Sequence, residues 1–150
     1  MDTRSIILFL LIIGIQQLPI NAQILEDSVE IFEFVEEFPL FPGCAELDVS
    51  YDEKKRCSDN EMRKFLMQKM VYSKEAREMG LEEKVFVRFV INTHGKIEQI
   101  ELNQGAAAPL KEMVRTAVER MNELPPWTPG YRRGKAVAVR LMMPIRIRLN

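Results

Sequence analysis

Few side chains in this sequence have types and spacings that suit chemistry. His94 is the single histidine of the 150 residues, and it stands beside Thr93 and Gly95 in a segment expected to be an exposed turn. A catalytic histidine needs a nucleophile or an acid presented beside it, and a threonine in a turn serves poorly. The sequence also shows no paired carboxylates and no phosphate-binding glycine loop. It therefore predicts a protein that is not an enzyme and has no cofactor, no metal and no small-molecule substrate.

The two cysteines, Cys44 and Cys57, form the other candidate site. In an exported protein, two cysteines most simply form one disulfide. Closing a loop of this size contributes about 3 kcal/mol in the chain-entropy model. A metal or redox role is the alternative, but the pair has neither CxxC spacing nor a nearby histidine.

The overall charge excludes one class of partner. The chain has 21 basic and 22 acidic residues, so no net positive field attracts nucleic acid or an anionic membrane. We expect no nucleic-acid partner.

The N-terminus resembles a secretory signal peptide. Arg4 precedes an apolar run, Pro19 interrupts it, and Ala22 offers a small residue for cleavage. As a helix, the run from Ser5 to Ile15 would measure about 16 Å, against about 30 Å for the hydrocarbon core of a membrane. We expect cleavage after Ala22, with an uncleaved inner-membrane anchor as the alternative.

The elements that must position any binding site end in one long strand. Apolar and polar side chains alternate strictly near the C-terminus, which is typical of a strand with one buried face. Pro144 lies within this strand and cannot donate a ladder hydrogen bond, so the strand belongs at a sheet edge or carries a bulge. The inward positions are Val137, Val139, Leu141, Met143, Ile145, Ile147 and Leu149, and the outward ones include Arg140, Pro144, Arg146 and Arg148.

The preceding elements predict an α+β fold. A capping box at Ser58 and Glu61 predicts a helix from about Asp59 to Met70, and a shorter helix runs from Ser73 to Met79. A hairpin follows, with its turn at residues 92–95 and a bulge early in its return strand. The clearest helix spans 109–124. Because a crossover helix places the last strand beside the first hairpin strand, we expect a three-stranded antiparallel sheet in the order 2-1-3 with two main helices on one face.

These segments together resemble the C-terminal domain of TonB-type energy transducers. The resemblance rests on VEEFPLFPGC at 35–44, on MVYSKEAREMGLEEKVFVRFVINTHGKIEQIEL at 70–102, and on LPPWTPGYRRGKAVAVRLMMPIRI at 124–147. It implies a periplasmic, non-enzymatic domain of TonB C-terminal type over residues 58–150. The signal peptide (1–22) and an arm with a short strand and the disulfide loop (23–57) would precede it.

The resemblance also implies a partner, an outer-membrane TonB-dependent receptor whose TonB box adds as a strand to the edge of the last strand. It assigns the docking edge to the last strand and a receptor contact to the segment 72–77. A homodimer formed by strand exchange is a further possibility, and a scaffolding module of the same fold without transport is the alternative function. The partner-binding residues are then Val137, Val139, Arg140, Leu141, Met143, Ile145, Arg146, Ile147, Tyr72 and Arg77, and the structural residues are Trp127, Pro129 and Gly130.

Some residues allow two readings. The arginines at 140, 146 and 148 suit an acidic partner segment, or they prevent indiscriminate strand pairing at an edge. Trp127 suits either a binding hot spot or the filling of the corner between helix and strand.

Two further hypotheses concern the arm. The short strand from Ile31 to Val35 is a candidate cover for the C-terminal edge. Only about forty residues, roughly 140 Å fully extended, separate the hydrophobic run from the first helix. We therefore expect the domain to bind without transmitting mechanical work by itself.

N-terminal sequencing of the mature protein after cell fractionation tests the signal peptide. We expect a soluble product that starts at Gln23, whereas an intact, membrane-bound chain would contradict the expectation.

Overall fold

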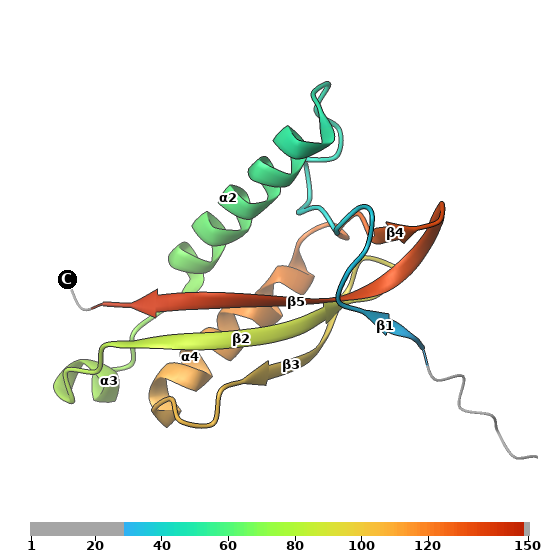
Figure 1. Ribbon diagram of the computed structural model, residues 1–150. Coiled ribbons are helices and arrows are strands. Elements are labelled where there is room, and N and C mark those ends of the chain that lie inside the picture. Colours follow the sequence, from blue (N-terminus) through green and yellow to red (C-terminus); the bar gives the residue numbers. More distant parts are fainter. Residues whose placement is uncertain (1–28, 149–150) are drawn as a thin grey trace, which may run out of the picture.

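The chain forms a twisted sheet with helices against one of its faces (Figure 1). A computed structural model describes residues 29–148, so the expected signal peptide and Leu149 lie outside the described residues. The fold is α+β, as the sequence predicted. In chain order the elements are β1 (Ile31–Phe32), α2 (Tyr51–Lys69), α3 (Lys74–Glu78), β2 (Glu83–Ile91), β3 (Ile97–Leu102), α4 (Ala108–Glu119), the 3₁₀ helix η1 (Arg120–Glu123), β4 (Gly130–Arg132) and β5 (Lys135–Ile147).

The sheet has five strands of mixed orientation, so the expected three-stranded antiparallel sheet is wrong in strand number and direction. The three long strands do lie in the predicted order, β3–β2–β5, and they pair antiparallel. The two additional strands are short pieces on β5. β1 runs parallel to it, with Ile31 opposite Ala138, and β4 runs antiparallel to it, with Gly130 opposite Val137. β1 lies within the arm strand predicted from Ile31 to Val35 but ends at Phe32. β4 has three residues, too few to show alternation, so periodicity does not reveal it.

The hairpin between β2 and β3 has the turn chemistry that the sequence predicted. The side-chain oxygen of Asn92 accepts backbone hydrogen bonds from His94 and Lys96 at 3.0 Å. Gly95 has a φ of +74°, in the left-handed region that glycine adopts without steric cost. The register of the ladder shifts partway along, and Gln99 of β3 has a φ of +51°, which confirms the predicted bulge.

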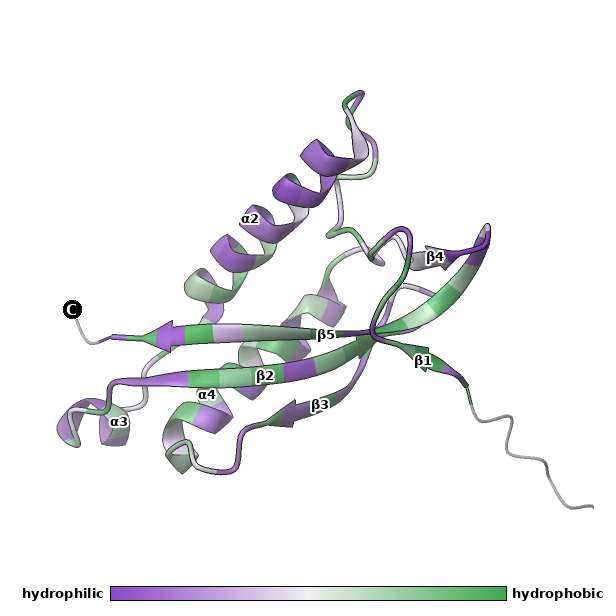
Figure 2. Cartoon of the chain, in the orientation of Figure 1, coloured by the Kyte–Doolittle hydropathy of each residue, from purple (hydrophilic) through white to green (hydrophobic). Residues whose placement is uncertain are grey.

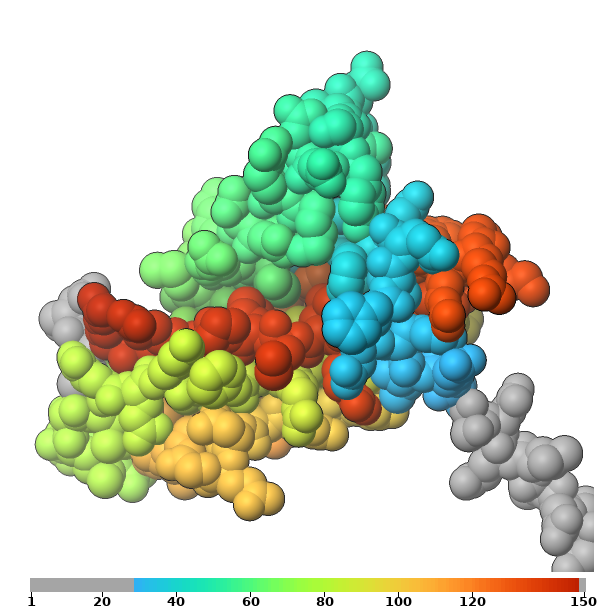
Figure 3. All heavy atoms as spheres, in the orientation of Figure 1, coloured from blue at the N-terminus to red at the C-terminus, as the bar shows by residue number. Residues whose placement is uncertain are grey.

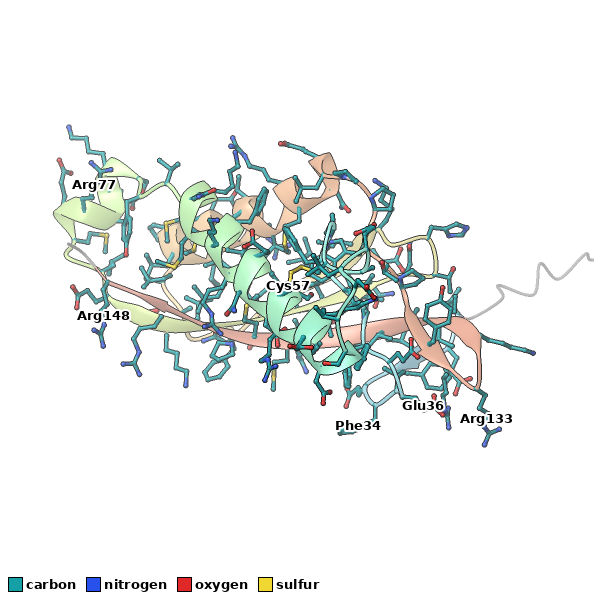
Figure 4. All side chains as sticks on the ribbon, turned by 90° about the horizontal axis from the view of Figure 1, so that it is seen from above. Phe34, Glu36, Cys57, Arg77, Arg133 and Arg148 are labelled. Carbon is teal, nitrogen blue, oxygen red and sulfur yellow. A yellow bond between two sulfur atoms is a disulfide. The ribbon has the colours of Figure 1, made fainter. Side chains whose placement is uncertain are left out.

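One face of the sheet and α4 enclose the core. Val85, Val87 and Phe89 of β2 are fully buried, and so are Leu110 and Val114 of α4. Each such side chain contributes about 1.5–3 kcal/mol relative to an exposed one. In the view from above, α4 lies on one side of the strands, whereas α2 crosses over β5 (Figure 4). α4 thus covers this face of the sheet, and α2 adds Met62 and Leu66 to the same core.

α2 begins at Tyr51, so the expected start at Asp59 is wrong. The capping box is Ser50 and Glu53, which exchange side-chain to backbone hydrogen bonds. Ser58 instead lies inside the helix, where its buried hydroxyl accepts a hydrogen bond from the Phe41 N–H at 2.7 Å. The S-x-x-E pattern occurs twice, at Ser50 and at Ser58. The first turns of α2 are polar, so apolar periodicity does not show which of the two begins the helix.

A disulfide fixes the polar first half of α2 to the arm. Cys44 and Cys57 are bonded, with their Cα atoms 5.8 Å apart. This half of α2 is largely hydrophilic (Figure 2), and the buried residues of the helix begin only at Ser58. Covalent attachment therefore substitutes for apolar packing at this end of the helix.

Trp127 fills the corner where the chain passes from η1 to β4. It is 3% exposed and packs edge-on against Phe41, with ring centroids 5.2 Å apart, and against Phe89, at 6.4 Å. Its backbone N–H donates to the Gly95 carbonyl at 3.0 Å, and Thr128 next to it exchanges backbone hydrogen bonds with Leu40 of the arm. The hairpin turn, the corner and the arm are thus joined at this point.

Gly95 and Gly80 offer a matched test of this junction. Both have positive φ, but a Cβ on Gly95 would lie 2.0 Å from the Trp127 carbonyl oxygen, whereas a Cβ on Gly80 meets nothing within 4 Å. We expect Gly80→Ala to cost about 1–2 kcal/mol for the left-handed backbone alone, and Gly95→Ala to cost about 3 kcal/mol or more. Urea unfolding followed by circular dichroism measures both, and equal costs would contradict this account.

The disulfide has its own test. Joint replacement of Cys44 and Cys57 by alanine is expected to reduce the free energy of unfolding by about 3 kcal/mol. Reductant should destabilise the native protein by a similar amount and leave the double variant unchanged. An unchanged urea midpoint in the double variant would show that the arm is held without the disulfide.

Candidate functional site

The outer edge of β5 is paired at one end and open at the other. β4 and β1 pair with the first residues of β5, and the pairing of β1 ends with Phe32 opposite Val139. This confirms that an arm strand pairs with β5, but the pairing covers two residues of the arm and leaves most of the edge uncovered. Beyond Val139, the strand ladders within residues 29–148 pair β5 with β2 alone. We call the stretch from Arg140 to Ile147 the free edge.

The backbone of the free edge presents hydrogen-bonding groups to the outside. Phe86, which lies opposite Pro144, uses its own N–H and C=O to bond Asn103 on the far side of β2. Phe86 and Pro144 are therefore a non-hydrogen-bonded pair, and Pro144 directs its backbone away from β2. The backbone N–H and C=O groups of successive residues point to opposite sides of a strand. Those of Met142 and Arg146 therefore also point away from β2. Their N–H groups, and the carbonyls of all three outward residues, face the free edge.

Pro144 accordingly sits at the edge and not at a bulge. The register between β2 and β5 continues without a shift across it. Its missing N–H falls on the outward side, so the proline removes no hydrogen bond from the sheet.

Two hollows flank the free edge, and α2 contributes to both. The first, of about 630 Å³, lies beside the start of the edge, and we call it the N-terminal hollow; it is lined by Glu33, Phe34, Phe38, Lys55, Arg88, Arg140, Leu141 and Met142. The second, of about 710 Å³, lies beside its end, and we call it the C-terminal hollow; it is lined by Arg63, Leu66, Met67, Met70, Tyr72, Met113, Met143, Pro144, Ile145, Arg146, Ile147 and Arg148.

The surface view shows β5 lying exposed between α2 and β2, with the arm crossing its beginning (Figure 3). Apolar side chains dominate the C-terminal hollow, among them Met67, which is 68% exposed. An extended segment laid along the free edge would meet backbone partners on one side and these apolar side chains beside it.

Both ends of the free edge are closed by side chains. At its start, the Arg140 guanidinium lies 3.9 Å from the carboxylate of Glu33, the residue that follows β1. At its end, the Tyr72 hydroxyl donates to the Arg148 carbonyl at 2.8 Å. Burial, with a smaller effect of Glu82, raises the pKa of Tyr72 above its ordinary value. Eight residues at about 3.3 Å each give a slot of roughly 26 Å.

The predicted partner-binding residues of β5 fall into three groups. Val137 and Val139 lie where β4 and β1 already pair with β5, so they are not on the free edge. The apolar side chains inward of the edge contact the core or the C-terminal hollow, namely Leu141, Met143, Ile145 and Ile147. Arg140 and Arg146 lie on the free edge itself.

Tyr72 lines the C-terminal hollow, whereas Arg77, on α3, does not. Figure 4 places Arg77 and Arg148 at the same end of the molecule, opposite Phe34 and Arg133. The residues predicted to be structural lie away from the slot. Trp127 and Gly130 are buried in the corner with Pro129 between them.

The wall provided by α2 was not predicted. Helical spacing places Met70 in the core and Arg63 on the solvent side of the helix, yet both line the hollow, and so does Met67. The linear pattern holds one signal: Met67 falls out of step with Met62, Leu66 and Met70. Only the folded chain shows that this flank faces β5.

The described residues show no arrangement for metal chemistry. Within 29–148, no three His, Cys, Asp or Glu side chains are grouped to hold a metal ion. His94 lies in its exposed turn with Nδ1 at 3.5 Å from the Thr93 hydroxyl. Among the same residues, no helix has the length and apolar character to cross a membrane.

Comparison with known proteins agrees with this fold. The solution structure of the Helicobacter pylori TonB C-terminal domain, residues 179–285, superposes with a TM-score of 0.50 at 23% sequence identity and covers 69% of this chain and 86% of its own. A second structure of that domain, residues 194–285, gives a TM-score of 0.44 at 24% identity and covers 59% of this chain and 89% of its own.

At this identity the likeness to the solved structure shows the fold alone. Among curated protein sequences, none matches this chain. The family profile described as Gram-negative bacterial TonB protein C-terminal matches residues 68–149, from the end of α2 through β5. The chain therefore belongs to the TonB C-terminal domain family.

Proposed function

We propose that this protein is a non-enzymatic periplasmic binding domain that accepts a segment of an outer-membrane TonB-dependent receptor as an added strand on the free edge of β5. In TonB proteins, the family acts in receptor interaction and energy transduction. The observation that carries the proposal is the free edge itself, which is uncovered among the described residues and presents outward backbone groups at Met142, Pro144 and Arg146.

Strand addition matches the chemistry of this edge. An added strand would satisfy the N–H groups of Met142 and Arg146 and the outward carbonyls, and each such hydrogen bond contributes about 0.5–1.5 kcal/mol. Alternate side chains of that strand would face the C-terminal hollow and contact Leu66, Met67 and Met70. Backbone pairing then supplies affinity, and the hollow supplies selectivity.

The slot also sets the length of what it accepts. β1 limits it at Arg140 and the Tyr72 hydroxyl limits it at Arg148. About eight extended residues fit between these two limits. This length suits a short linear segment and not a whole sheet.

A proline at position 142 tests strand addition at a single backbone group. Met142→Pro removes an N–H that points outward and places a ring on the free edge, so β2 should keep all its partners in β5. With a synthetic TonB-box peptide of a TonB-dependent receptor from the same cell, we expect affinity to fall at least about tenfold, as measured by isothermal titration calorimetry.

Met142→Ala is the matched control, because it shortens the side chain but keeps the N–H. It should bind the peptide within about threefold of the native protein. Equal binding by Met142→Pro and Met142→Ala would contradict strand addition at this edge. Failure of every receptor segment to bind the native protein would favour the scaffolding alternative.

A further inference from the structure

The sheet has a second edge, on β3, opposite the edge formed by β5. Among residues 29–148, the strand ladders pair β3 with β2 alone, so the sheet ends at the other side of β3. An edge of this kind presents unpaired backbone groups with which another strand can pair. The backbone groups of β3 that point outward therefore decide whether this second edge also accepts a strand.

The hydrogen bonds of the hairpin show which β3 residues point outward. Asn92 donates its backbone N–H to the Lys96 carbonyl at 2.9 Å, so Lys96 faces the partner strand and Ile97, next to it, faces away. At the other end, Phe86 bonds Asn103 across the hairpin, and Arg88, two residues along β2, points the same way.

Glu101, which lies opposite Arg88, consequently faces β2. Its neighbour Ile100 then points its N–H and C=O groups outward. The outer edge of β3 thus presents the backbone groups of Ile97 and Ile100.

Asn122 of η1 occupies the position of a partner strand beside Ile97. Its side-chain oxygen accepts a hydrogen bond from the Ile97 N–H at 2.8 Å, and its side-chain nitrogen donates to the Ile97 carbonyl at 3.0 Å. A residue of an antiparallel strand makes the same two bonds to the residue opposite it, one accepted and one donated. The carboxamide of asparagine has both functions and can replace a peptide group here.

Arg115 of α4 closes the next outward position. Its Nη1 donates a hydrogen bond to the Ile100 carbonyl at 3.2 Å. Arg115 and Asn122 are seven residues apart on the helical segment, and Ile97 and Ile100 are three apart on β3; both spacings are about 10 Å. The helical segment thus runs antiparallel to β3 and places one side chain at each outward residue. Between them, the bulge at Gln99 makes the edge irregular.

The two edges of the sheet are therefore treated differently. On β5, the side chains of Glu33 and Tyr72 lie only at the two ends of the free edge. On β3, the side chains of Asn122 and Arg115 bond the outward backbone groups themselves.

We propose that Asn122 and Arg115 keep the β3 edge closed to strands, and above all to the β3 strand of a second copy of this chain. Two identical edges can pair antiparallel about a two-fold axis, which is the commonest symmetry of protein dimers. For the proposed function, the consequence is that a partner segment finds one open edge and not two. The inference itself does not rest on that function, because the excluded pairing involves no receptor.

Opening the edge tests the inference. Arg115→Ala together with Asn122→Ala frees the Ile97 N–H and the carbonyls of Ile97 and Ile100. Asn122 is exposed, so its replacement leaves no cavity in the core, and circular dichroism should show a folded variant. By sedimentation velocity up to millimolar concentration, we expect the variant to self-associate at least about tenfold more tightly than the native protein.

Arg120→Ala is the matched control. Arg120 is an exposed cation at the start of η1, and among residues 29–148 it makes no side-chain hydrogen bond to β3. This variant loses the same charge as Arg115→Ala and should sediment as the native protein does. Self-association of equal strength in the control would show that lost charge, and not an opened edge, is the cause.

Hydrogen exchange at the Ile97 amide locates the pairing. This amide should exchange slowly in the native protein, fast in the dilute double variant, and slowly again once the variant associates. A folded double variant that stays monomeric, or an associated one whose Ile97 amide still exchanges fast, would overturn the inference. If the double variant does not fold, Asn122→Ala alone frees both Ile97 groups and decides by the same two measurements.

Discussion

The antiparallel ladder between β2 and β5 is the interaction on which the rest of this structure depends. It extends along the whole of β2, from Glu83 opposite Ile147 to Ile91 opposite Val139. It turns one set of side chains into the core against α4 and points the backbone of Met142, Pro144 and Arg146 outward. Because β3 occupies the other side of β2, the sheet ends at the outer side of β5 beyond Val139, where the pairing with β1 stops. The same pairing that stabilises the domain thus creates its candidate binding edge.

The features that could be predicted from the sequence are those encoded in patterns of neighbouring residues. The alternation in β5, the turn at Asn92 and Gly95, and the bulge near Gln99 are local patterns, and the structure has all three. The order of the three long strands also followed, because a crossover helix constrains which strand returns beside which. Pro144 predicted either an edge position or a bulge for this strand, and the unshifted register with β2 shows the edge position.

The features that sequence reasoning missed depend on contacts between distant segments. β4 has three residues, and only its place beside β5 makes it a strand. The predicted arm strand exists as β1, but it ends at Phe32 and pairs only with the start of β5. The start of α2 was misplaced because Ser50 and Ser58 open equivalent capping patterns in polar surroundings. The C-terminal hollow forms where a flank of α2 faces β5, and helical periodicity assigned that flank to solvent or core.

The first third of the described chain precedes the matched domain and adds to it. The family match starts at residue 68, so the arm, the disulfide and most of α2 precede it. These parts limit the free edge at Arg140 through β1, and they place Arg63 and Met67 beside its far end. The disulfide holds the end of α2 that has the least apolar packing. The arm therefore both shortens the binding edge and supports one of its walls.

The central claim is that a partner segment pairs with the outer backbone of β5, and NMR couplings across hydrogen bonds measure this directly. With labelled domain and labelled peptide, the account predicts scalar couplings from the amide nitrogens of Met142 and Arg146 to carbonyl carbons of the bound peptide. A bound peptide whose contacts all fall on α3 or on the open face of the sheet, with those two amides uncoupled and still exchanging freely with solvent, would contradict it.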